Sequence, residues 1–182
     1  MQSLVKIVFL LFAISGATGQ EIYKSTSVVA EFFSSAPIED IAARADDGLS
    51  LWNTRTGEIT FRVNIRSFQF EKGKMQEHFN ENFMESQKYP YATFKGEVKD
   101  QPQPFEPGNY EVMLAGVLEI HGVKQNREVQ AKVQVKESGM ELQTDFTVPV
   151  AAHDIEIPKI LWRNIAEEIS VKVHANYSKL DP

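Results

Sequence analysis

Apolar and polar residues alternate with a period of two along most of this chain, and that alternation predicts β-strands. The first regular stretch follows the turn-like pair Thr56-Gly57, with apolar Ile59, Phe61, Val63 and Ile65 separated by polar residues. Similar stretches occupy 92–98, 110–120, 129–135, 140–148 and 169–177. With less regular stretches at 27–33 and 48–52, the pattern predicts about eight strands.

Short turn signals such as Pro107-Gly108-Asn109 and Ser138-Gly139 separate most of these stretches, which is typical of an antiparallel meander. Closing such a sheet removes its exposed edges, and an eight-stranded barrel has room for packed side chains or one small ligand. We therefore predict an all-β, eight-stranded antiparallel barrel. A two-sheet sandwich fits the same alternation.

Two segments depart from the alternation and predict short helices. Within 74–88, Met75, Phe79, Phe83 and Met84 fall on one helical face, and Tyr89-Pro90 is expected to end the helix. This helix is expected to cover one mouth of the barrel. A second helix is predicted over 35–45, where Ser35-Ala36-Pro37 offers a cap and a first-turn proline.

The N-terminus predicts a secretory signal peptide at 1–19, which leaves one domain at 20–182. Lys6 supplies a positive charge, 7–14 is an unbroken apolar run, and Ala17-Thr18-Gly19 matches the small-residue cleavage pattern. Eight apolar residues in a helix cover about 12 Å of a roughly 30 Å hydrocarbon core, too little to cross a membrane. We expect an exported protein, periplasmic or secreted, without stable membrane insertion.

Composition narrows the chemistry. The chain has no cysteine, which excludes disulfides and thiolate chemistry. Its net charge is −6, without basic clusters, which argues against nucleic acid as a partner. The four histidines lack zinc-site spacing and no nucleophile-elbow motif is present, so neither a metal nor a cofactor is predicted.

Phenylalanine is abundant, with 12 residues, most of them on the apolar face of a predicted strand or helix. Such rings either fill the barrel interior or line a cavity for an apolar tail. The polar groups available at the mouth of such a cavity are His121, Arg127 and the pair His153-Asp154. The pair is expected at an exposed strand end. His121 fits a turn in which its ring bonds nearby backbone, and a head-group contact is the alternative reading.

Several motifs, in order, resemble the YceI-like family of bacterial, lipocalin-like polyisoprenoid-binding proteins. The most specific are the YP-x-x-x-F-x-G stretch at 89–96 and Ile120-His121-Gly122-Val123-Lys124. Phe68-x-Phe70, His78-Phe79, Phe83 and Gly116-x-Leu118 also match, and the similarity runs from about 22 to 177. The start of the domain, Glu119 and 125–127 depart from the usual pattern.

The resemblance implies a lipocalin-like barrel that holds an isoprenoid-tailed amphiphile, a polyisoprenoid or a quinone, for transport or storage. The alternative is an enzyme or processing factor that acts on such a lipid. A homodimer is compatible with either reading. The candidate ligand-binding residues are Phe61, Phe68, Phe70, Phe79, Phe83, Phe94, Leu118 and His121.

Overall fold

The computed structural model describes residues 21–35, 39–102, 105–157 and 166–180, and ten strands lie within them. The expected signal segment at 1–19 lies outside the described residues. The strands are β1 (Ile22–Ser34), β2 (Ile41–Ala45), β3 (Gly48–Asn53), β4 (Glu58–Asn64), β5 (Gln69–Phe70), β6 (Tyr91–Lys99), β7 (Gly108–Ile120), β8 (Val123–Lys136), β9 (Gly139–Pro149) and β10 (Glu168–Lys179).

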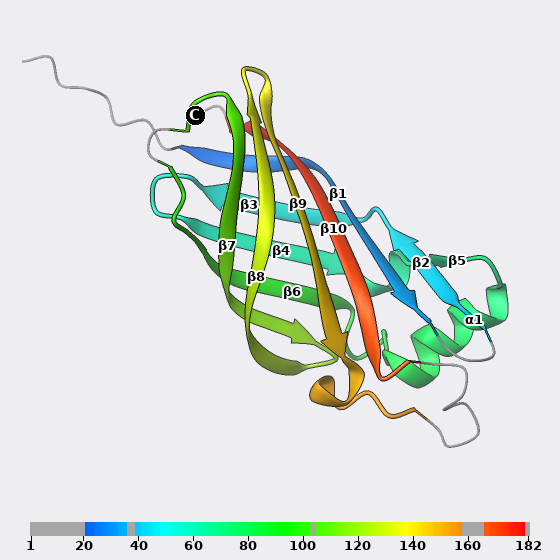
Figure 1. The fold of residues 1–182 in the computed structure, drawn as a ribbon. Coiled ribbons are helices and arrows are strands. Elements are labelled where there is room, and N and C mark those ends of the chain that lie inside the picture. The colour runs from blue at the N-terminus through cyan, green and yellow to red at the C-terminus, as the bar shows by residue number, and fades with distance from the viewer. Residues whose placement is uncertain (1–20, 36–38, 103–104, 158–165, 181–182) are drawn as a thin grey trace, which may run out of the picture.

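Eight of these strands close into an antiparallel barrel (Figure 1). The ring runs β1-β3-β4-β6-β7-β8-β9-β10 and closes because β10 also pairs with β1. The contact between β1 and β10 extends over most of both strands, from Tyr23 opposite Lys179 to Phe33 opposite Ser170. The predicted eight-stranded barrel is therefore confirmed over the sandwich.

The helix predicted at 35–45 is wrong where the structure describes it. Ile41–Ala45 forms β2, which pairs with the second half of β1, while β3 pairs with its first half. Ala43 and Ala45 are buried and Arg44 is exposed, the alternation of a half-buried strand. Residues with good helix propensity are held in a strand here because β1 offers an unpaired edge.

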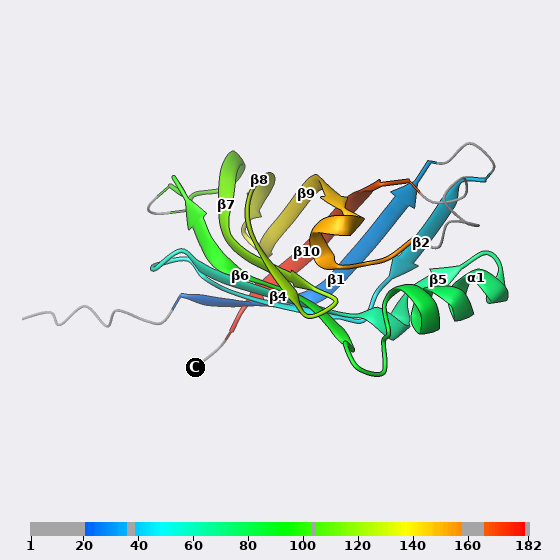
Figure 2. The ribbon, with the colours of Figure 1, turned by 90° about the horizontal axis from the view of Figure 1, so that it is seen from below.

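The helix predicted at 74–88 is present in shorter form. An α-helix, α1 (Gly73–His78), continues into one π-helical turn, η2 (Phe79–Phe83). The helical path ends at Glu85, whose φ of 41° lies in the left-handed region, before the expected stop at Tyr89-Pro90. Figure 2 shows α1 beside β5 at one end of the barrel.

The opposite end of the barrel is filled by side chains. Trp52, Leu142 and Ala175 have no exposed surface, and Tyr177 is almost completely buried among them. The rings of Trp52 and Tyr177 meet edge to face, with centroids 5.9 Å apart. Half of the interior is therefore an ordinary packed core, which fixes the barrel shape around the other half.

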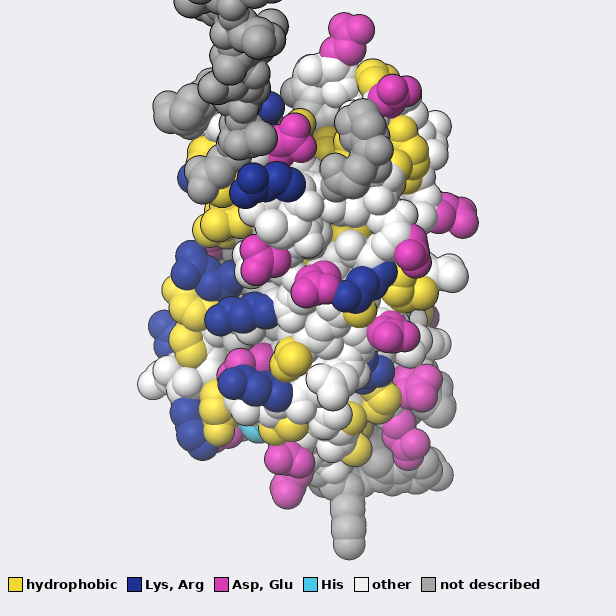
Figure 3. All heavy atoms as spheres, turned by 90° about the vertical axis from the view of Figure 1, so that its left-hand side faces the viewer, with side chains coloured by type: hydrophobic (Ala, Val, Ile, Leu, Met, Phe, Trp, Pro, Cys, Tyr) yellow, Lys and Arg dark blue, Asp and Glu magenta, His cyan; other side chains and the backbone are white. Residues whose placement is uncertain are grey.

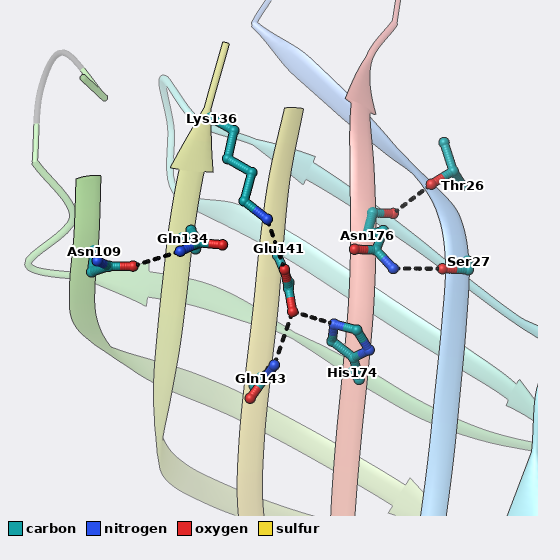
Figure 4. Close-up of polar contacts among 9 residues, drawn as sticks. All are labelled: Thr26, Ser27, Asn109, Gln134, Lys136, Glu141, Gln143, His174 and Asn176. Carbon is teal, nitrogen blue, oxygen red and sulfur yellow. Dashed lines mark hydrogen bonds and ion pairs between the residues drawn. The ribbon is translucent and has the colours of Figure 1, made fainter. Parts of the chain in front are cut away.

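A polar network on the outer wall joins neighbouring strands near this packed end (Figure 4). The Glu141 carboxylate on β9 accepts hydrogen bonds from Gln143, from His174 on β10 and from Lys136 on β8. These bonds, led by the one from Gln143, hold the pKa of Glu141 below its ordinary value. Asn176 of β10 separately bonds Ser27 of β1, so a polar contact also crosses the closure of the barrel.

Candidate functional site: an apolar cavity in the barrel

The half of the barrel beneath the helix contains a cavity of about 330 Å³. Its lining comes from β1, β2 and β4 to β10, from α1 and η2, and from Ile155 and Ile157 after β9. Ligand cavities in proteins typically measure about 300–1,000 Å³ and are lined mainly by apolar side chains. The size and lining of this cavity suit one small apolar ligand or part of a longer one.

Three of the candidate residues form a continuous stripe on the inner wall. Phe61 of β4 lies opposite Phe94 of β6, and Phe94 lies opposite Leu118 of β7. Two-residue alternation directs all three side chains inward, and all three line the cavity. This stripe crosses the cavity wall, and the lining continues beyond it to Leu114 of β7 and Val129 of β8.

Four phenylalanines from different elements form a cluster at the helix end of the cavity. The Phe79 ring centroid lies 5.5 Å from that of Phe32, 5.6 Å from that of Phe68 and 5.0 Å from that of Phe70. Phe83, one turn further on, also lines the cavity. The helix face predicted from sequence, Met75, Phe79, Phe83 and Met84, thus faces inward and covers this end of the cavity.

His121 lies outside the cavity lining. It occupies the two-residue turn between β7 and β8 with a φ of 53°. Its Nδ1 lies 3.2 Å from the carbonyl oxygen of His153, and its Nε2 lies 3.0 Å from Oε2 of Glu85. Both partners are acceptors, so the ring donates both bonds only when each nitrogen carries a proton. His121 therefore joins this turn to the end of the helical segment and to the segment after β9.

His153 is buried, which corrects the expectation that His153-Asp154 is an exposed strand end. It ends a short 3₁₀ helix, η3 (Val150–His153), and its Nδ1 lies 3.2 Å from the carbonyl oxygen of Val123. Burial lowers the pKa of His153, and the positive charge of Arg127 adds to the lowering, while nearby backbone carbonyls and Asp154 oppose it. The ring is thus held neutral beside the first residues of β8.

The wall between β8 and β9 is paired over only part of its length. Backbone pairing runs from Lys136 opposite Gly139 to Ala131 opposite Thr144, and the earlier residues of β8 have no partner on β9. Here η3 lies beside β8, and Gln125 Nε2 donates to the carbonyl oxygen of Ala152 at 2.7 Å. Figure 2 shows β8 and β9 diverging on either side of this segment.

Few charged side chains line the cavity. Glu39 does so near the helix, where its carboxylate pairs with Lys72, and His78 lies on α1. Arg127 of β8 is the one lysine or arginine among the described lining residues. The outer wall, by contrast, carries many charged side chains (Figure 3). On the face drawn in Figure 3, many basic side chains lie along one side, and acidic side chains lie over the middle and other side.

Within the described residues, no cluster of three or more His, Cys, Asp or Glu side chains is placed to hold a metal ion. None of the helices in that part of the chain has the length and apolar content needed to cross a bilayer.

Sequence reasoning missed part of the lining, namely Phe32 on β1, Phe146 on β9 and Val171 and Val173 on β10. Phe146 and the valines fall within the alternating stretches at 140–148 and 169–177, but nothing in the alternation separates the packed half of a strand from the cavity half. Phe32 was missed because the exposed Phe33 follows it directly. Its even-numbered register with Val28 and Ala30 was the available signal.

The fold and site together define an eight-stranded barrel with an interior cavity, the lipocalin-like class of β-barrels. A family model described as the YceI-like domain matches residues 23–177, and the chain therefore belongs to that family. A search among curated proteins gave no match.

Solved structures share the fold at low sequence identity. A polyisoprenoid-binding domain from Saccharophagus degradans, implicated in plant cell wall breakdown, matches with a TM-score of 0.76 and 19% identity, covering 87% of this chain and 98% of its own. BcnA of Burkholderia cenocepacia matches with a TM-score of 0.69 and 14% identity, covering 82% of this chain and 95% of its own. The YceI protein of Campylobacter jejuni matches with a TM-score of 0.56 and 14% identity, covering 100% of this chain and 94% of its own.

Proposed function

We propose that this protein binds an amphiphile with an isoprenoid tail, a polyisoprenoid or a quinone, and holds the tail in the barrel cavity. The observation that carries the proposal is the phenylalanine-rich cavity of about 330 Å³ beneath α1 and η2. Burial of apolar tail surface contributes roughly 25 cal/mol per Å², which accumulates along a chain. Membership of the YceI-like family and the shared fold of a polyisoprenoid-binding domain support it.

The protein acts as an exported carrier or store in this proposal. Support comes from the apolar run at 7–14 and the small residues at 17–19, which together favour removal of residues 1–19 during export. A periplasmic or secreted barrel with a closed apolar interior shields a lipid tail from water without entering the bilayer.

Binding without chemistry fits the site better than catalysis. The lining hydroxyls whose bonds are seen use backbone groups: Thr144 Oγ1 donates to the carbonyl oxygen of Gln130, and Ser34 Oγ accepts from the amide of Ala166. Among the described residues, no lining hydroxyl is hydrogen-bonded to a lining histidine or carboxylate, as an activated nucleophile would require.

Thermal unfolding of delipidated protein tests the proposal. A ligand that binds only the native state at 100 times its Kd adds about 2.7 kcal/mol, or roughly 5–10 °C in Tm for a domain of this size. A long isoprenoid should give this rise, and a water-soluble analogue of its head group should not. No rise with any long isoprenoid would contradict the proposal.

Variants that place a charge inside the cavity give a second test, with a matched control on the outer face. Arg in place of Phe94 puts a charge on the inner stripe, and Phe146→Arg does so at a half-buried position that tolerates change better. Either folded variant should lose the Tm rise. Glu97→Arg, on the exposed face of the same strand as Phe94, should keep it.

A further inference from the structure

Arg127 occupies a cavity-facing position where the pattern of β8 calls for an apolar residue. The half-buried residues Gln125, Arg127 and Val129 alternate with exposed Lys124, Asn126 and Glu128. Val129 and Arg127 both line the cavity. A guanidinium on the inner face of a barrel wall is costly to desolvate, so its place there calls for a partner.

No partner is present within the described part of the chain. The Nε atom of Arg127 is buried and has no hydrogen-bond acceptor there, and no ion pair of this side chain is found among the described residues. Arginine carries five N–H donors in a planar fork that matches a planar oxygen group. The missing acceptor is therefore one that a ligand can bring.

The positions directly across the sheet from Arg127 are glycines. Gly116 of β7 lies opposite Arg127, and Gly96 of β6 lies opposite Gly116. A Cβ on Gly116 would lie 2.5 Å from the Cα of Gly96, so this close approach of two strands admits only glycine. These two positions therefore offer the guanidinium no side-chain acceptor.

Arg127 also lies where the wall is least sealed. It belongs to the part of β8 before Ala131, and this part is not paired with β9. A head group held there lies near the edge of the cavity, while the tail extends past Phe61, Phe94 and Leu118 toward the helix end.

We propose that Arg127 binds the head group of the stored amphiphile, and that this head group presents a planar oxygen acceptor, a carbonyl or a carboxylate, to the guanidinium. The proposal rests on the proposed function and deepens it by assigning the polar end of the ligand. A carboxylate is expected to bind most tightly, since it also supplies a negative charge, whereas the lining carboxylate of Glu39 is already paired with Lys72.

Dissociation constants for three ligands with the same isoprenoid tail test the assignment: a hydrocarbon without a head group, a quinone and a carboxylic acid. Wild-type protein should bind the carboxylic acid and the quinone about tenfold or more tightly than the hydrocarbon, the value of one charge-assisted hydrogen bond. In Arg127→Met this preference should vanish, while affinity for the hydrocarbon is kept or rises. Arg62→Met, which removes the same charge from the outer wall beside Tyr91, should keep the preference.

The outcomes separate the two proposals. Equal affinity for all three ligands in wild-type protein, or a preference that survives in Arg127→Met, overturns the head-group site and leaves tail binding intact. Failure of every ligand to bind wild-type protein overturns the proposed function itself. Retained hydrocarbon binding by Arg127→Met shows that the variant is folded.

Discussion

The phenolic oxygen of Tyr177 lies 2.6 Å from the hydroxyl oxygen of Ser50, inside the packed end of the barrel. Tyr177 belongs to β10 and Ser50 to β3, the two strands that flank β1, so this bond spans the closure of the ring. Burial raises the pKa of Tyr177 well above its ordinary value, which keeps the phenol neutral. The packed end, built around this bond and Trp52, holds the cavity end in shape.

Replacing Tyr177 by Phe should lower the free energy of unfolding by about 1–2 kcal/mol, because a buried hydrogen bond is lost and the Ser50 hydroxyl keeps no partner of equal quality. Urea unfolding measures the loss. Ser50→Ala combined with Tyr177→Phe should cost less than the sum of the single changes, since the two residues share one interaction. Additive costs would show that the bond contributes little.

Gly122, in the turn between β7 and β8, occupies a backbone conformation that other residues avoid. Its φ is 76°, and an added Cβ would lie 2.5 Å from Cε1 of Tyr89. Gly122→Ala should therefore cost more than about 1 kcal/mol, through both strain and displacement of the Tyr89 ring. Gly73→Ala is the matched control, because an added Cβ there meets nothing within 4 Å. Equal melting temperatures for Gly122→Ala and wild type would contradict this account.

The phenylalanines of the helical cover should contribute to ligand affinity. Phe79 and Phe83 line the cavity and are only half-buried. Changing both to Ala removes apolar surface that a bound tail would contact, so affinity for a long isoprenoid should fall at least tenfold while the barrel remains folded. The pair Glu77→Ala and Glu81→Ala, on the opposite face of the helix, should leave binding unchanged. Undiminished affinity in the folded Phe79/Phe83 double variant would show that the helical cover does not contribute to ligand binding.

The free energy of unfolding should decrease as the pH is lowered, over a range set by the pKa of His153. Its pKa in the folded state lies below the ordinary 6.5. The unfolded chain then takes up a proton before the folded chain does, so this contribution is complete above about pH 6.5 and is lost as pH falls from there toward the folded pKa. Urea unfolding across this range measures the loss, and His153→Asn should flatten the curve there. The decline below about pH 4.5 to which Glu141 contributes should remain. An unaltered profile in His153→Asn would show that another group titrates.

The barrel was predictable because alternation recurs in each wall strand, whereas local exceptions came from tertiary contacts. Ile41–Ala45 has the composition of a helix, but the free edge of β1 makes it a strand. The helix over 73–83 was recognised from Met75, Phe79 and Phe83, yet its end at Glu85 depends on a left-handed conformation without a sequence signal.

The apolar character of the candidate site was predictable, but the extent of the cavity was less so. Seven of the eight candidate residues line the cavity, because an apolar strand face must point into a barrel. His121 does not, since its ring bonds His153 and Glu85 outside the lining. Which half of each strand faces packed core and which faces open space depends on distant partners such as Tyr177 and Trp52, and period-two alternation carries no information about them.

The most direct test of lipid binding is mass spectrometry of a solvent extract from protein purified out of its own host without detergent. If the cavity holds a tail, the extract contains an isoprenoid amphiphile in near-stoichiometric amount, and an extract of the Phe146→Arg variant, prepared in parallel, does not. An extract of wild-type protein free of isoprenoid and of any other long-chain lipid would contradict the central claim, because the cavity would then be empty where its ligand is available.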